Sequence, residues 1–465
     1  MHSFNTITTK KQLLTLLILV VFVGGSITAC GKAKDTQTLI SEAIQYQQEG
    51  DDKAAIIQLK NALQKSSDNS EARYLLGVLY NKSGDPLSAE KELNKALSLG
   101  MAPEKVLPVL GSTLFDLGEF QQLLDKTEQL STVSNTPEIS ILRANALLAL
   151  GKLPEAKDIF EQILSEKPDA PDALIGLAKY SLSQKDLEAA TQFTEQAVTK
   201  NPENADAWLF KADLLRAQNK IDQALIAYDQ VIQLKPDSVS AHVNRATIQI
   251  SKREFDAAKT SLDAARKVSP GALVITYTQA LLDFNQEEHA EALASLQQIL
   301  SVMPEHLPSV LLAGAVQFSL GSPIQAEQYL EKYLQRIPDN LYARKLMTSI
   351  LLKNGRTQQA IDILVPTLKA VKEDPQLFAL AGEAYMKAQN FTQATEYFEK
   401  ANELVPNNAK LHTALGISKL AQGDKDHGIA ELELATNLDA KSSRAGVVLA
   451  LTHLRLKEFD KAMLA

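Results

Sequence analysis

The sequence predicts an all-α fold built as a tandem array of about thirteen helix-turn-helix units. The first observation is a proline every 34 residues, at positions 168, 202, 236, 270, 304 and 338, with Pro406 two periods later. The second is that small residues recur every 34 residues in two separate series. Only Thr348 interrupts the first series. These are Ala178, Ala212, Ala246, Ala280, Gly314, Gly382 and Gly416, then Ala156, Ala190, Ala224, Ala258, Ala292, Ala326, Ala360 and Ala394. The third is a hydrophobic share of 45% with only 6% aromatic residues, which favours close-packed Ala- and Leu-rich helices over sheets.

Residues 1–29 have the layout of a secretory signal peptide. Lys10 and Lys11 precede the apolar run Leu13 to Val23, and small residues follow as far as Cys30. The alternative is a transmembrane anchor, but the apolar run rises about 1.5 Å per residue and reaches only about half of a ~30 Å hydrocarbon core. The sequence therefore favours a signal peptide.

Cys30 is the only cysteine in the chain, so no intramolecular disulfide can form. The stretch ITAC at 27–30 resembles the lipobox of bacterial lipoproteins, with Ile27 in place of the usual leucine. The resemblance implies that Cys30 is lipidated and becomes the first residue of the mature chain, followed by a lipid-anchored linker over 30–38. In such lipoproteins an aspartate directly after the cysteine would argue for the inner membrane, and this chain has Gly31 there. The resemblance therefore implies an outer-membrane lipoprotein facing the periplasm of a Gram-negative bacterium. Several acyl chains together make a stable anchor.

The charge balance disfavours polyanionic partners. The net charge is −8, and removal of the signal takes away two lysines and no acid. A chain with an excess of acids repels nucleic acid and anionic lipid at long range. No nucleic-acid partner is therefore expected.

Each 34-residue unit is predicted to form two amphipathic helices. In residues 205–238, for example, Leu225, Tyr228 and Ile232 recur at helical spacing. The proline ends the second helix, and the Asp, Asn or Ser that follows can cap the next one. This pattern resembles the tetratricopeptide repeat (TPR). We expect the array to occupy 39–465, with a degenerate unit around Gly111 and an incomplete last repeat.

Stacked repeats form a groove, and the TPR resemblance places ligands on its concave side, along the first helix of each unit. The mixture of apolar and charged residues predicted there suits an extended or helical protein segment, although solvated helix faces would look the same. No consecutive units repeat the lysines and asparagines with which some TPR domains hold a terminal carboxylate. The candidate partner-binding residues are Tyr74, Asn81, Lys179, Asp213, Arg216, Asn244 and Glu383, with apolar Val78, Ile175, Leu182, Leu209 and Met386 beside them.

Residues that could carry catalysis are scarce. The seven histidines show neither metal-protease spacing nor a cysteine partner, and no P-loop, nucleophile elbow or dinucleotide fingerprint occurs. Trp208 stands where a TPR helix carries a large packing residue. We therefore expect a protein that is not an enzyme and that has no cofactor or metal.

The segment Gly50 to Gly100 resembles the TPR lipoproteins of PEP-CTERM/exosortase systems, most specifically in AAIIQLKNALQ and GDPLSAEKEL. The resemblance implies a periplasmic scaffold that binds envelope proteins in exopolysaccharide export or in sorting of PEP-tagged proteins. Two alternatives stay open: a pilotin-like assembly factor for an outer-membrane secretin or barrel, and the repeat part of a longer TPR-bearing glycosyltransferase.

Overall fold

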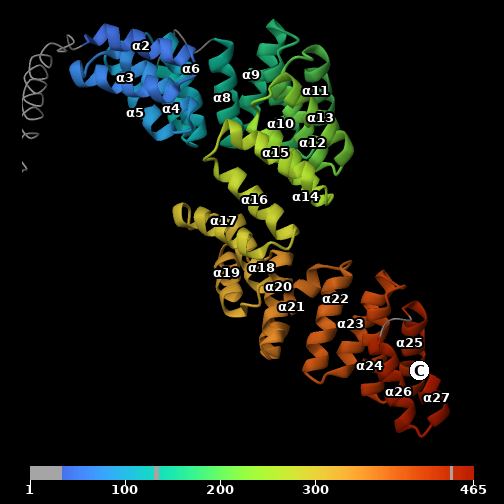
Figure 1. The fold of residues 1–465 in the computed structure, drawn as a ribbon. Helices are drawn as coiled ribbons and strands as arrows, with labels where there is room; N and C mark the ends of the chain where they lie inside the picture. The colour runs from blue at the N-terminus through green and yellow to red at the C-terminus, as the bar shows by residue number, and fades with distance from the viewer. Residues whose placement is uncertain (1–33, 130–135, 440–442, 465) are drawn as a thin grey trace, which may run out of the picture. The chain divides into compact units, whose positions relative to one another are not determined.

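The computed structural model describes residues 34–129, 136–439 and 443–464 (Figure 1). Every regular element in these ranges is a helix, which confirms the predicted all-α fold. The proposed signal peptide and Cys30 lie outside the described residues. The chain divides into two compact units, 1–227 and 228–465, whose boundary falls within helix α13. Each unit is described by itself.

The helices alternate between a first and a second helix of each repeat. The first helices are α2 (Thr36–Gln48), α4 (Ser70–Lys82), α6 (Pro103–Asp116), α8 (Pro137–Ala149), α10 (Pro171–Ser183), α12 (Ala205–Ala217), α14 (Val239–Ser251), α16 (Leu273–Asn285), α18 (Leu307–Ser319), α20 (Leu341–Lys353), α22 (Pro375–Lys387), α24 (Ala409–Gln422) and α26 (Ser443–Arg455). The second helices are α3 (Asp52–Lys65), α5 (Pro86–Ser98), α7 (Phe120–Gln129), α9 (Leu153–Glu166), α11 (Leu187–Lys200), α13 (Ile221–Leu234), α15 (Phe255–Val268), α17 (His289–Val302), α19 (Pro323–Arg336), α21 (Thr357–Ala370), α23 (Phe391–Leu404), α25 (Lys425–Leu438) and α27 (Phe459–Leu464).

The small residues of the 34-residue series are the contact points between paired helices. A Cβ on Gly416 would lie 2.8 Å from Leu432 Cγ, and one on Gly382 would lie 2.5 Å from the Phe398 ring. All eight alanines of the second series are 0% exposed. The interruption at Thr348 is tolerated because its buried hydroxyl donates to the carbonyl of Arg344, at 2.8 Å. Close packing thus explains the sequence period.

The turns between repeats follow the predicted proline rule. Helix α11 ends at Lys200, two residues before Pro202, and α12 begins after the cap Asn204. The side chain of Asn204 accepts a hydrogen bond from the amide of Ala207, at 2.8 Å. The proline stops one helix because it has no N–H, and the cap satisfies a free N–H at the start of the next.

A side chain near the start of several first helices ties that helix to the preceding turn. Its N–H donates to the carbonyl of the repeat proline, six residues earlier, at 2.6 to 2.9 Å. The four donors are Trp208, His242, Arg344 and His412. The tryptophan and these two histidines are therefore structural residues of the turn.

The repeat around Gly111 departs from the others, as predicted. Helix α6 contains Pro108 in its interior. A Cβ on Gly111 would lie 3.0 Å from Leu142 of α8, in the next repeat. The small residue here makes room for the following first helix.

Candidate functional site

First helices of successive repeats contact one another within each unit, for example α8 with α10 and α20 with α22. Residues at equal positions of neighbouring repeats therefore form rows across these helices. Among the described residues, hollows lie along the first helices of unit 1 and of unit 2. Of the residues that the sequence predicted for partner binding, Glu383 and Met386 line one of these hollows.

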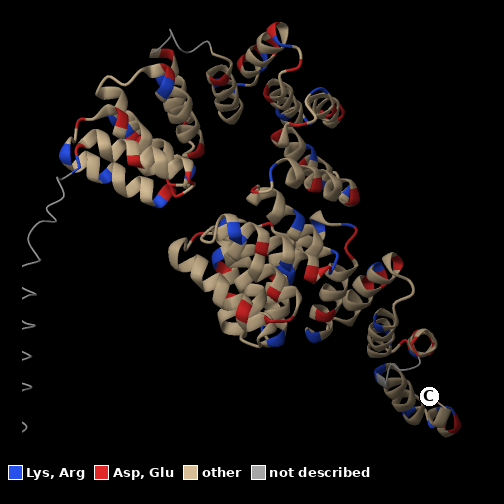
Figure 2. Cartoon of the chain, turned by 45° about the horizontal axis from the view of Figure 1, so that its top comes forward, with Lys and Arg blue, Asp and Glu red and all other residues tan. Residues whose placement is uncertain are grey.

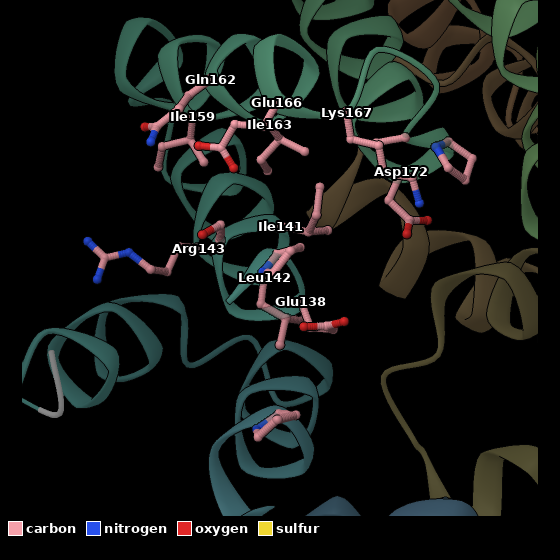
Figure 3. Close-up of a pocket in the computed structure, with 15 residues that line it drawn as sticks. Glu138, Ile141, Leu142, Arg143, Ile159, Gln162, Ile163, Glu166, Lys167 and Asp172 are labelled. Atoms are coloured by element: carbon pink, nitrogen blue, oxygen red, sulfur yellow. The ribbon is translucent and has the colours of Figure 1, made fainter. Parts of the chain in front are cut away.

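The hollow of unit 1 lies among α6, α8, α9 and α10 and has a volume of about 740 Å³. Figure 3 shows Ile141 of α8 and Ile163 of α9 beside this space, with the carboxylates of Glu138, Glu166 and Asp172 near it. Burial raises the pKa of the Asp172 carboxyl, and nearby acids add to the shift. The hollow thus combines apolar side chains with a carboxylate that is partly withdrawn from water.

Three of the predicted binding residues lie on α10 and α12. Lys179 is exposed, and its Nζ lies 6.0 Å from the centre of the Phe210 ring on the next first helix. Partial desolvation lowers the pKa of Lys179, and the charge of Asp172 opposes that shift. Asp213 and Arg216 form an ion pair at 3.7 Å in which both side chains keep solvent contact.

Two further predicted residues, on α4, take part in internal packing. Tyr74 is half-buried against an apolar cluster that includes Leu93 and Val106. The side-chain oxygen of Asn81 accepts a hydrogen bond from the Thr113 hydroxyl of α6, at 3.1 Å. Both residues help to join adjacent repeats, and their role in binding stays a prediction.

The remaining two predicted residues lie in unit 2. Asn244 is half-buried on α14. Glu383 is exposed and lines a hollow together with Met386, which the sequence analysis placed beside it. The structure thus brings these two predicted residues together at one place.

The hollow over α16, α18 and α20, called here the aromatic hollow, is almost free of charge and has a volume of about 580 Å³. Burial raises the pKa of Tyr277 and of Tyr342 at its wall. Tyr342 is nonetheless 49% exposed. The lining residues are Tyr277, Leu281, Phe284, Asn285, Leu307, Pro308, Leu311, Leu312, Tyr333, Ile337 and Tyr342.

The hollow over α22, α24 and α26, called here the cationic hollow, has a volume of about 570 Å³. Lys387, Lys410 and Arg444 line it, each from a different first helix, and Glu383 is the one acid in the lining. Its apolar part includes Met386, Phe398, Ala414 and Ile417.

The cations and tyrosines that line these two hollows are not among the binding residues predicted from the sequence. The same 34-residue step could have found three of them, since Tyr342, Lys410 and Arg444 occupy one row together with Gln376. This row lies in the first turn of the first helices, whereas the predicted binding residues lie at later positions of those helices.

The described ranges contain neither a candidate metal cluster nor a candidate membrane-spanning helix. They hold no group of three or more His, Cys, Asp or Glu that could bind a metal ion. Among the helices of these ranges, none is long and apolar enough to cross a membrane.

Comparison with known families identifies the repeat. Models of the tetratricopeptide repeat match residues 317–384, and also residues 70–99 and 375–408. Each unit has a tetratricopeptide-repeat fold. Residues 111–259 match the N-terminal ARM repeat of tetratricopeptide repeat protein 21. TPR scaffolds generally bind protein partners.

One curated relative is the type IV pilus assembly protein PilF of Pseudomonas aeruginosa, which is 23% identical over 159 residues. The match covers 34% of this chain and 63% of PilF. Solved structures with some likeness include Cut9–Hcn1 of the APC/C, at 14% identity and a TM-score of 0.48, covering 97% of this chain and 94% of that chain. A TPR protein of Parabacteroides merdae has 18% identity and a TM-score of 0.43, and covers 53% of this chain and 98% of its own.

Proposed function

We propose that this protein is a scaffold of the bacterial outer membrane that holds envelope proteins together through the first helices of its repeats. The observation that carries the proposal is the pair of hollows in unit 2, each lined by three successive first helices. Both are open to solvent and each combines apolar area with polar groups, which suits an extended or helical segment of a partner protein.

The support for the proposed membrane location is the sequence of the amino terminus. A basic, apolar and small-residue layout ends in the lipobox-like ITAC, and Cys30 is the one residue there that can be lipidated as in bacterial lipoproteins. A lipid on Cys30 would place both repeat units in the periplasm.

The pathway we propose is exopolysaccharide export or the sorting of PEP-tagged proteins by an exosortase. The support is the amino-acid sequence of residues 50–100, which resembles that of the TPR lipoproteins of those systems. The test is affinity capture from membranes with the lipidated protein, combined with deletion of its gene. We expect polysaccharide-export or exosortase components among the captured proteins, and loss or mislocalisation of exopolysaccharide or PEP-tagged proteins in the deletion strain. Normal polysaccharide and normal sorting in that strain would refute this pathway.

A second candidate is assembly of a type IV pilus or of an outer-membrane secretin. The support is the match to PilF, a type IV pilus assembly protein, over 159 residues. The same capture experiment separates the two candidates, because recovery of pilus or secretin components in place of polysaccharide-export proteins would select this one. Loss of surface pili in the deletion strain would support it further.

A further inference from the structure

Charge is divided unevenly between the first and second helices at the carboxyl-terminal end of unit 2. The first helices α20, α22, α24 and α26 carry eight Lys or Arg and a single acid, Glu383. The second helices α21, α23, α25 and α27 carry eight acids and four Lys. Figure 2 shows cations and acids interspersed along the ribbon, so the division is visible only when helices are compared by their place in the repeat. A chain of net charge −8 thus presents cations on its first helices here.

Several of these cations already have internal partners. Lys345 pairs with Asp374 at 2.9 Å, and Lys419 lies 3.3 Å from Glu399. Arg344 pairs with Asp339 at 2.8 Å. These side chains contribute to the repeat itself.

The three cations of the cationic hollow differ from them. Within the described part of the chain, Lys387, Lys410 and Arg444 form no ion pair within 4.0 Å. Lys387 is held in place by donating from Nζ to the carbonyl of Leu352, at 2.8 Å, which leaves its positive charge without a carboxylate. Three such charges around one hollow favour an anionic ligand, because opposite charges across an interface select the partner and speed association.

The apolar part of the hollow narrows the choice of ligand. Met386 and Ile417 are half-buried, and Phe398 beside them is 2% exposed. Carboxylates would contact the rim and leave these side chains in contact with water. A ligand that also inserts an apolar side chain would remove that surface from water and add binding free energy of about 25 cal/mol per Å².

We propose that the cationic hollow binds a segment of a partner protein in which acidic side chains flank an apolar residue. The proposal rests on the proposed scaffold function and specifies the chemistry of the segment that one partner would present. Arg444 can hold a carboxylate with two parallel N–H donors, whereas Lys387 and Lys410 act as point charges. Glu383 repels carboxylates from its own edge, so the acids of the segment lie toward α24 and α26. Anionic polysaccharide is disfavoured because it has no apolar side chain for Met386 and Ile417.

The test measures binding of fluorescent dodecapeptides to the full chain by anisotropy. The probe peptide has an amidated end and one leucine among Asp and Glu, and its partner replaces those acids by Asn and Gln. We expect the acidic peptide to bind more tightly and to weaken as salt rises. Lys410→Glu combined with Arg444→Glu should raise Kd about tenfold or more, because it replaces attraction by repulsion. Glu383→Gln should lower Kd.

The matched control is Lys369→Glu combined with Lys425→Glu, two exposed cations of second helices. It changes the net charge by the same amount, and we expect Kd to stay within about twofold of the parent because long-range charge alone is screened by salt. Equal binding of the neutral peptide, or an unchanged Kd in the hollow variant with its helicity retained, would overturn the proposal. Stronger competition by an oligouronate than by unlabelled peptide would also overturn it, in favour of a carbohydrate. If the chain captures envelope proteins but does not bind the acidic peptide, the proposal for the cationic hollow is wrong and the scaffold function is still supported.

Discussion

The absence of a Cβ atom at a glycine decides how closely the two helices of a repeat can pack. Gly176 of α10 lies against Phe160 of α9, and a Cβ there would sit 2.2 Å from a ring carbon. The Phe160 side chain is 0% exposed, so its ring has no space into which it can move. The glycine is therefore required by the neighbouring ring, since its own backbone is ordinary helix.

We expect Gly176→Ala to destabilise unit 1. Alanine has the better helix propensity by about 1 kcal/mol. Overpacking a filled core costs typically about 1–3 kcal/mol, so the steric effect should win. Chemical denaturation followed by circular dichroism measures the outcome. The control is Gly271→Ala, where no atom lies within 4 Å of the added Cβ, and a gain of up to about 1 kcal/mol is expected there. A more stable Gly176→Ala protein would contradict the packing argument.

Asp283 is a buried acid whose charge reduces stability. It is 6% exposed and accepts a hydrogen bond from Gln279 Nε2 at 2.7 Å, while Gln279 Oε1 accepts from Arg266 Nη2 at 2.9 Å. Burial raises the pKa of the Asp283 carboxyl, and Glu288 adds to the shift, although the hydrogen bond from Gln279 opposes it. The folded state therefore binds this proton more tightly than the unfolded state does.

The sign of the pH effect follows from linkage. Because the folded pKa lies above the unfolded one, the charged carboxylate costs stability at neutral pH, and that cost disappears as pH falls through the folded pKa to below the unfolded value. Asp283→Asn should therefore be more stable than the parent at pH 7, since an amide oxygen can still accept from Gln279. The difference should shrink as pH falls, which urea denaturation at several pH values measures. A variant that is less stable at pH 7 by a constant amount at every pH would contradict this.

At the scale of the helix, the sequence predicted the pairing but not the lining of the surface. The helix period was readable because each contact between paired helices requires a small residue at the same place. The hydrogen bond between Asn81 and Thr113 could not be predicted from the sequence. Nothing in the repeat of either residue shows that the two side chains meet across adjacent repeats. The cations of Lys410 and Arg444 were readable in principle from their common step, but which charges remain without a carboxylate depends on the fold.

A charge placed at a buried alanine of the second 34-residue series should destabilise the repeat that contains it. Ala190 of α11 is 0% exposed and α11 packs against α10. Ala190→Asp buries a carboxylate, at a cost of several kcal/mol unless it is neutralised or paired. We expect faster amide hydrogen exchange in α10 and α11. Gln192→Asp on the exposed side of the same helix is the control and should leave exchange nearly unchanged. Equal effects of the two substitutions would contradict the pairing.

At the scale of the whole molecule, stability and binding are distributed along the chain. Within each unit a helix contacts its neighbours in sequence, and the pairs over longer separations join adjacent repeats. Stability of such arrays is approximately a sum of repeats and their interfaces. Under the proposed scaffold function, hollows on different repeats would therefore bind different partners independently of one another.

The proposed attachment to a membrane depends on Cys30. Cys30 lies outside the described residues, so its lipidation is a prediction from sequence. Each buried CH₂ of an acyl chain contributes about 0.8 kcal/mol, and several chains together make anchoring stable. Cys30→Ser removes the thiol that would carry them and should release the protein from the membrane fraction, with no incorporation of labelled palmitate. Because the repeats begin at α2, helicity and partner capture by the released chain should match the parent. A Cys30→Ser protein that stays in the membrane fraction after a high-salt wash would refute the lipid anchor, since salt removes electrostatic attachment but leaves insertion intact.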